Sequence, residues 1–121
     1  MSAAVEAYKV DTTAWGGSAY YIPQFVSDAT SSELLEKINA APRTRWKDLA
    51  RRRLQNWGGL PGPKGMVPEP MPAWLDAVGA RLEALGIFEK AAYIRPNHCL
   101  VNEYRVGQGI MVRNKYPHCN C

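Results

Sequence analysis

The chain has 121 residues, of which 46% are hydrophobic and 21% are charged, and its net charge is +4. These values predict one small globular domain and argue against a disordered or fibrous chain. No apolar run is long enough to cross a membrane and no secretory leader is recognisable, while three cysteines make no disulfide framework, so we expect a cytoplasmic or nuclear protein.

The first third of the chain predicts a leader followed by a strand and a helix. Residues 1–18 are small and polar, and we expect a flexible leader without chemistry. The run Tyr20–Val26 is aromatic and β-branched, which predicts a short strand that Pro23 confines to an edge or end. The capping-box pattern of Thr30–Glu33 predicts a helix start, and Pro42 ends that helix.

A basic segment, Arg43–Arg53, combines six cations with Trp46. Cations meet phosphates and a tryptophan offers a stacking face, so this segment is a candidate nucleic-acid interface. Its candidate contacts are Lys47, Arg51, Arg52 and Arg53. The alternative is a solvated basic surface with Trp46 in the core, which composition alone favours because short basic runs are common.

Five prolines and two glycines stand within residues 61–72, which predicts an ordered loop without regular structure. The same proline spacing also fits a ligand for an aromatic groove on another protein. The loop is expected to end with Pro72 in the first turn of a helix that reaches Leu85 and is capped by Gly86. An apolar stripe on this helix comprises Leu75, Val78, Leu82 and Leu85, and we expect it to pack in the core.

The segment Cys99–Arg105 alternates like a strand and is bounded by a proline before it and glycines after it. Asn102 and Tyr104 stand two residues apart, so a strand places both side chains on one face. An amide and a phenol each donate a hydrogen bond, and a carboxylate would suit both. His98, at the start of the strand, is expected to be an ordinary histidine without a catalytic role.

Three blocks carry a resemblance to the AlkB-like dioxygenases, which use Fe(II) and 2-oxoglutarate. They read Y-Y-I-P-x-F-V-S from Tyr20, R-x-L-Q-N-W-G-G-L-P from Arg52, and N-H-x-L-V-N-x-Y-x-x-G-x-G-I-M from Asn97. Three long blocks in the same order are more specific than one short motif. The resemblance implies an α+β fold, with residues 19–111 forming the N-terminal lobe and opening strand of an incomplete double-stranded β-helix, or jelly roll. We expect three or four strands and two helices.

The resemblance also implies roles for particular residues. It assigns the binding of the 2-oxoglutarate carboxylate to Asn102 and Tyr104. Where the family continues into the iron ligands H-x-D, this chain has Arg113 and Lys115, and cations do not ligate a divalent metal. We therefore expect residues 112–121 to be a divergent tail, and the chain to be a truncated form without catalytic or metal-binding residues. Alone it would bind neither Fe(II) nor 2-oxoglutarate.

Several functions remain open at this point. The activity implied by the resemblance is oxidative demethylation of alkylated nucleic acid. The alternatives are a non-catalytic module that binds nucleic acid weakly and in a salt-dependent way, or a protein-interaction module that uses the proline stretch or the leucine stripe. The soft ligands His118, Cys119 and Cys121 are too poorly spaced for a predicted zinc site. Unpaired strand edges predict an aggregation-prone or partly unfolded chain.

Overall fold

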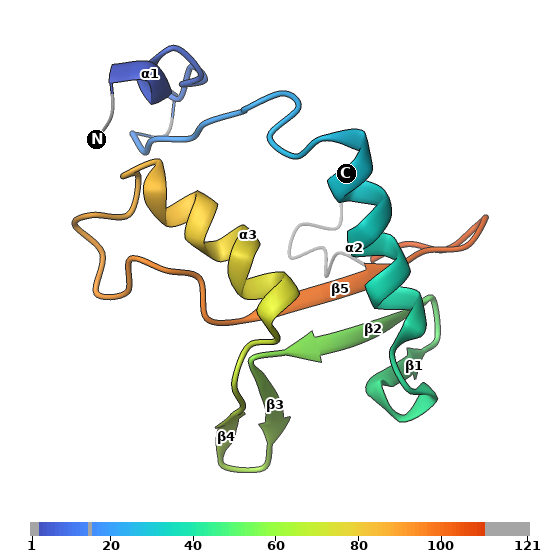
Figure 1. The fold of residues 1–121 in the computed structure, drawn as a ribbon. Coiled ribbons are helices and arrows are strands. Elements are labelled where there is room, and N and C mark those ends of the chain that lie inside the picture. Colours follow the sequence, from blue (N-terminus) through green and yellow to red (C-terminus); the bar gives the residue numbers. More distant parts are fainter. Residues whose placement is uncertain (1–2, 15, 111–121) are drawn as a thin grey trace.

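The structure is a computed structural model that describes residues 3–14 and 16–110, and it has the α+β architecture that the sequence predicts (Figure 1). Its sheets are antiparallel, and it has five strands rather than three or four. The elements in chain order are α1 (Ala3–Glu6), α2 (Asp28–Ala40), a 3-10 turn (Arg43–Arg45), β1 (Trp46–Leu49), β2 (Arg52–Trp57), β3 (Gly59–Gly62), β4 (Gly65–Pro68), α3 (Ala73–Ala84) and β5 (Cys99–Glu103).

The main sheet has three strands in the order β1-β2-β5, with both pairs antiparallel. Asp48 pairs with Arg53, and Arg53 pairs in turn with Glu103. Because side chains alternate along a strand, these three residues share one face, which we call the helix-side face. Lys47, Leu49, Arg52, Leu54 and Asn102 occupy the opposite face, which we call the far face.

Helices α2 and α3 lie on the same side of this sheet (Figure 1). The side chain of Gln55, which is 0% exposed, donates a hydrogen bond to the Ile38 carbonyl of α2 at 2.9 Å and accepts one from Trp57 Nε1 at 2.9 Å. Trp57 in turn meets Trp74 of α3 edge to face, with ring centroids 5.3 Å apart. One buried amide and two indoles therefore join the sheet to both helices.

Helix α2 starts earlier than the capping-box pattern predicts. Its N-cap is Ser27, whose Oγ accepts a hydrogen bond from the Thr30 backbone N–H at 3.1 Å. Ser27 has the extended backbone that an N-cap needs, whereas Thr30 already lies in the first turn. The helix ends at Ala40, before Pro42, as predicted.

The strand predicted for Tyr20–Val26 is wrong. Only Tyr20 forms a bridge, with Lys9, and the chain then turns through Gln24 at a φ of 53°. Arg81 of α3 donates a hydrogen bond to the Phe25 carbonyl at 2.5 Å and lies over the Phe25 ring. This segment therefore packs against a helix instead of pairing in a sheet.

The prediction that residues 61–72 lack regular structure is also wrong. Strands β3 and β4 form a two-stranded hairpin, with Gly65 at a φ of 116° at its turn. Both strands of an isolated pair are edges, so Pro61 and Pro68 can stand where no N–H is needed. Pro72 is the N-cap of α3 rather than a first-turn residue, and Gly86, at a φ of 73°, follows the helix as predicted.

The described part of the predicted leader, residues 3–14 and 16–18, has more structure than expected. It forms α1, where Val5 is 2% exposed, and the Thr12 hydroxyl donates a hydrogen bond to the Gly17 carbonyl. The tail, with Arg113, Lys115 and the His118–Cys121 group, lies outside the described residues. Predictions about the tail therefore stay predictions.

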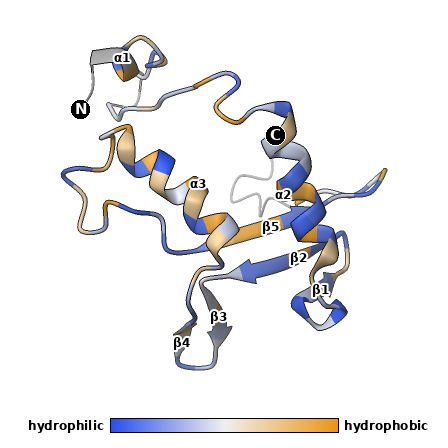
Figure 2. Ribbon diagram, viewed as in Figure 1, coloured by the Kyte–Doolittle hydropathy of each residue, from blue (hydrophilic) through white to orange (hydrophobic). Residues whose placement is uncertain are grey.

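The core is small. Among residues 3–14 and 16–110, the buried hydrophobic side chains are Val5 and Leu54. Figure 2 shows hydrophobic residues on β5 and α3, whereas the central strand β2 is hydrophilic. None of the helices in these two ranges has the length and apolar character needed to span a bilayer. The helices and sheet are therefore joined mainly by half-buried side chains and by polar pairs.

Candidate functional site

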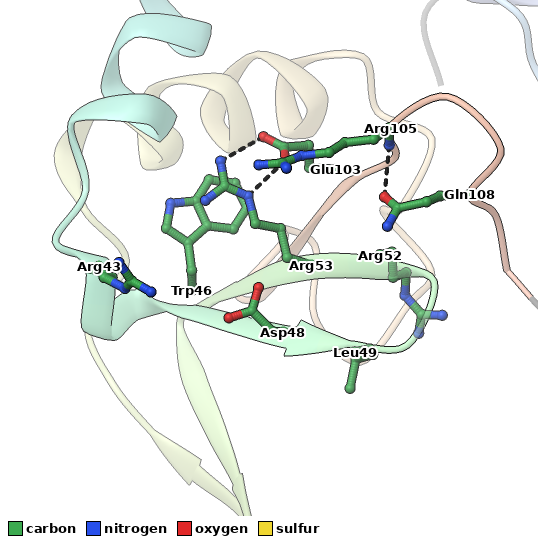
Figure 3. Close-up of a pocket in the computed structure, with 9 residues that line it drawn as sticks. All are labelled: Arg43, Trp46, Asp48, Leu49, Arg52, Arg53, Glu103, Arg105 and Gln108. Carbon is green, nitrogen blue, oxygen red and sulfur yellow. Dashed lines mark hydrogen bonds and ion pairs between the residues drawn. The ribbon is translucent and has the colours of Figure 1, made fainter.

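A basic pocket of about 290 Å³ opens beside strands β1 and β2 and the segment that follows β5 (Figure 3). It is lined by Arg43, Trp46, Asp48, Leu49, Arg52, Arg53, Glu103, Arg105 and Gln108. Four arginines face two carboxylates in this lining, so the pocket has an excess of positive charge. An excess of guanidinium groups around a cavity favours anionic ligands.

The strongest pair in the basic pocket joins β2 to β5. Arg53 Nε lies 2.7 Å from Glu103 Oε1, and Arg53 Nη2 lies 2.8 Å from Glu103 Oε2. These hydrogen bonds lower the pKa of Glu103 and raise the pKa of Arg53. Glu103 thus occupies the Nε–Nη2 edge of the Arg53 guanidinium, and the Nη1 edge makes no contact with this carboxylate.

Trp46 holds the same guanidinium from another side. The Arg53 Cζ atom lies 3.9 Å from the centroid of the Trp46 ring, which is a cation–π contact. Figure 3 shows both side chains on one side of the β1–β2 ribbon, with Arg52 and Leu49 on the other. Arg53 therefore covers one face of the ring, so that face is not open to a nucleic acid base.

Two other arginines of the pocket are less engaged. Arg105 Nε lies 3.7 Å from Glu103 Oε1, and the Arg105 side chain is 75% exposed. Its backbone N–H donates a hydrogen bond to Gln108 Oε1 at 2.8 Å. Arg43 has no ion-pair partner in the part of the chain that the structure describes. The carboxylate of Glu103 thus lies between two guanidinium groups, those of Arg53 and Arg105.

The four residues predicted to contact nucleic acid do not form one cluster. Lys47 and Arg52 lie on the far face and Arg53 on the helix-side face, because strand side chains alternate. Arg51 stands in the turn between β1 and β2 and donates a hydrogen bond to the Gly107 carbonyl at 3.0 Å. Lys47 is exposed and forms no ion pair within the described ranges. Their role in binding nucleic acid stays a prediction.

The two residues predicted to bind a carboxylate are placed at the end of β5. Asn102 lies in the strand, and its Oδ1 accepts a hydrogen bond from Arg52 Nε at 3.0 Å. Within residues 3–14 and 16–110, that bond leaves the amide N–H groups of Asn102 free to donate. Tyr104 follows the strand and is 42% exposed. The structure therefore adds a cation, Arg52, beside the predicted amide.

Metal-ligating residues are not grouped in the described ranges. Between residues 3 and 110, Trp15 aside, no three His, Cys, Asp or Glu residues lie where they could hold a metal ion. His98 is half-buried, and its Nε2 has no hydrogen-bond partner in the same ranges. Burial raises the pKa of the adjacent Cys99 thiol, which makes it a weaker nucleophile.

Several residues of the basic pocket were not singled out from the sequence, namely Asp48, Glu103, Arg105 and Gln108. The Arg53–Glu103 pair spans 50 residues of sequence. It exists because β2 and β5 are neighbours in the sheet and pair in one register. The alternation of side chains within one strand does not show which other strand it pairs with. The signal in the sequence was the density of cations in Arg43–Arg53, the segment that contributes six of the nine lining residues.

Comparison with known proteins agrees with the resemblance carried by the three sequence blocks. No protein-family model matches the chain. An alignment of 100 residues, 83% of this chain, at 48% identity shows that the chain belongs to the AlkB-like family. The relative in that alignment is the probable RNA/DNA demethylase ALKBH6 of Danio rerio. The chain spans 42% of the length of this relative.

Proposed function

We propose that this chain is the part of an AlkB-like nucleic-acid demethylase that contacts the nucleic acid and one carboxylate of 2-oxoglutarate. The name of the relative, a probable RNA/DNA demethylase, supports the substrate class. In the family that the chain resembles, Fe(II) and 2-oxoglutarate supply the oxidising chemistry. The chain supplies positioning groups for that chemistry.

The hydrogen bond between Arg52 and Asn102 is the observation that carries this proposal. It connects β2 to β5 at 3.0 Å and places a guanidinium beside the amide that the resemblance assigns to 2-oxoglutarate. An ionised carboxylate accepts charge-assisted hydrogen bonds from a guanidinium, an amide N–H and a phenol O–H, and the guanidinium adds a positive charge of its own. Arg52, Asn102 and Tyr104 together provide those three kinds of donor.

The chemical step needs more than these residues supply. A family site needs two histidines and a carboxylate around iron, with open positions for the cosubstrate and oxygen. The described ranges contain no such group, and Arg113 and Lys115 stand where the resemblance would place two of the ligands. We therefore propose that the chain alone binds nucleic acid without demethylating it.

Salt-dependent binding of a single-stranded oligonucleotide tests the nucleic-acid part of the proposal. We expect a dissociation constant of about 10⁻⁴–10⁻⁶ M near physiological salt, as is usual for binding that reads only phosphates. A Lys47→Ala, Arg51→Ala double variant should lower the slope of log affinity against log salt by about 0.7 for each phosphate that is no longer neutralised. Fluorescence anisotropy at several salt concentrations measures both quantities.

The matched control for this experiment is Lys64→Ala, because Lys64 stands in the β3–β4 turn, outside the main sheet. An equal effect of the control, or binding that ignores salt, would contradict the proposed interface. Anaerobic calorimetry with Fe(II) and 2-oxoglutarate tests the other part. Tight binding that the Asn102→Ala, Tyr104→Ala double variant abolishes would show that the chain builds a complete cofactor site.

A second candidate function, protein interaction, is favoured by one observation. The β3–β4 hairpin exposes Leu60, Met66 and Val67, at 41%, 51% and 59% of their surface. Leu60 and Val67 are paired across the two strands, so they form one apolar surface. Binding through this surface would persist at high salt, whereas binding through phosphates would not.

A further inference from the structure

We propose that the basic pocket binds a phosphate group through Arg43 and Arg105, and that the Glu103 carboxylate is an internal anion that competes with it. This inference deepens the proposed function, on which it rests, by naming a phosphate site in the basic pocket, whose lining does not include Lys47. The ligand chemistry is a phosphate oxyanion, whether it belongs to a nucleic acid backbone or to a free phosphate.

The availability of guanidinium groups supports this assignment. Arg53 donates two hydrogen bonds to Glu103, and its guanidinium lies over the Trp46 ring. Arg43 has no ion-pair partner within residues 3–14 and 16–110, and the contact of Arg105 with Glu103 is long, at 3.7 Å. Arg43 and Arg105 are therefore less engaged than Arg53, and both line one cavity of about 290 Å³, which is at the small end of the range for ligand pockets.

The position of Glu103 indicates what the pocket attracts. Its carboxylate lies between Arg53 and Arg105, as a phosphate would, and both guanidinium groups lower its pKa. A carboxylate and a phosphate offer similar oxygen acceptors to a guanidinium fork. Because like charges repel at this range, the carboxylate weakens the binding of any second anion. Removing its charge should therefore strengthen phosphate binding.

The accessibility of the Trp46 ring determines whether the pocket can contact the base of a nucleotide or only its phosphate. Arg53 covers one face of its ring at 3.9 Å, so that face cannot stack on a base. Apart from Trp46, the pocket is lined by four arginines, two acids, Leu49 and the Gln108 amide, so Trp46 is the one aromatic residue in its lining. Recognition is thus through the phosphate and independent of base identity, in the manner of backbone contacts.

The test uses the indole N–H of Trp46 as a reporter. The chain is labelled with ¹⁵N in its four tryptophans, and Trp46→Phe assigns the signal. Inorganic phosphate is titrated at constant ionic strength, and a 5′-phosphorylated single-stranded oligonucleotide is titrated in a parallel series. The wild-type Trp46 signal should shift and saturate, whereas Lys64→Gln, a control in the β3–β4 turn, should behave as the wild type does.

The variants give opposite expected results. Arg43→Gln with Arg105→Gln should weaken phosphate binding by about tenfold, since charge-assisted hydrogen bonds are removed at two sites. Glu103→Gln should strengthen it by about fivefold, since a charge repelling phosphate at close range is removed. Weaker or unchanged binding by a folded Glu103→Gln variant would overturn the inference. If that variant does not fold, Arg105→Gln alone is used, because it leaves the Arg53–Glu103 pair intact. Weaker phosphate binding by Arg105→Gln would support the inference, and unchanged binding would overturn it.

Failure of this inference is distinguishable from failure of the proposed function. If the oligonucleotide binds through Lys47 and Arg51 while the Trp46 signal does not respond to either probe, the phosphate site is absent and the proposed interface stands. If inorganic phosphate shifts the Trp46 signal and the oligonucleotide does not bind, the pocket takes free phosphate. The inference then holds, and the nucleic-acid part of the proposed function fails.

Discussion

At the scale of single residues, polar groups rather than large apolar side chains define this structure. Gln55 is fully buried and satisfies both the Ile38 carbonyl and the Trp57 indole. Arg53 and Glu103 form the best-aligned ion pair of the main sheet. A buried group that loses its partner is expensive, whereas a partly exposed ion pair is screened by water and contributes modestly. The two cases lead to different predictions.

Replacing Gln55 by leucine should destabilise the chain by roughly 1–3 kcal/mol, because the Trp57 indole N–H loses its partner and the Ile38 carbonyl keeps only the Ala41 N–H. The same replacement at Gln108, which is exposed, should cost less than about 1 kcal/mol. Urea unfolding followed by tryptophan fluorescence measures both. Equal midpoints for the two variants would show that Gln55 is not the junction between sheet and helices.

Acid should weaken the link between β2 and β5. The hydrogen bond from Arg53 lowers the pKa of Glu103 below the ordinary value of 4.5. The folded chain therefore holds this proton less tightly than the unfolded chain, and the stabilisation is present above pH 4.5 and lost as pH falls through the lowered folded pKa. Unfolding midpoints of the wild type and Glu103→Gln should differ near neutral pH and converge in acid.

The control for that series is Glu36→Gln, which removes an exposed carboxylate of α2 that forms no ion pair within the described ranges. A constant gap between the wild type and Glu103→Gln from pH 7 to pH 3 would contradict the assignment of the acid effect to Glu103.

At the scale of elements, strand alternation and register decide which charges meet. The sequence places Lys47 and Arg51–Arg53 close together, yet β1 and β2 direct them to two faces and a turn. The helix starting near residue 28, the strand near Cys99 and the cap at Gly86 were predictable because local chemistry specifies them. The β3–β4 hairpin was not predictable from the sequence. Proline is tolerated only in edge strands, and the sequence does not show which strands pair and which are edges.

Gly58, the residue between β2 and β3, should tolerate substitution poorly. It connects β2 to β3 at a φ of 88°, and a Cβ there would overlap the Asn97 carbonyl oxygen and lie 2.9 Å from Met71 Sδ. Gly58→Ala should therefore cost more than about 2 kcal/mol, because strain adds to a clash with backbone. Chemical denaturation of the purified variant measures this cost.

Gly107 offers a matched control for Gly58. Its φ is 81°, and a Cβ there would meet no atom within 4 Å. Gly107→Ala should show only the conformational penalty of about 1 kcal/mol. If both alanine variants lose the same stability, the close approach of Asn97 is not what requires glycine at position 58.

At the scale of the whole molecule, residues 3–14 and 16–110 form a small core and leave sheet edges open. Strands β1 and β5 are the two outer strands of the main sheet, and Leu100 on β5 is 48% exposed. Unpaired edges with apolar side chains promote association between chains. A chain with few fully buried apolar residues also has a weak driving force for folding.

We therefore expect the isolated chain to unfold over a broad temperature range and to associate in a concentration-dependent way. Calorimetry at two protein concentrations and light scattering at each temperature measure these properties. A sharp two-state transition of a monomer, independent of concentration, would show that the half-buried side chains and polar pairs suffice for cooperative folding.

The amino-acid sequence by itself determined the family, the α+β class and the two longer helices. It also determined strand β5, which carries the Asn102 predicted to bind a carboxylate. Each of these depends on motifs or on periodicity within a short window. Only the tertiary structure decided that Arg52 meets Asn102, that Glu103 holds Arg53 against Trp46, and that the predicted nucleic-acid contacts lie on two faces. The pairs Arg52–Asn102 and Arg53–Glu103 each connect residues 50 positions apart. They exist because β2 pairs with β5 in one register, which depends on the packing of the whole sheet.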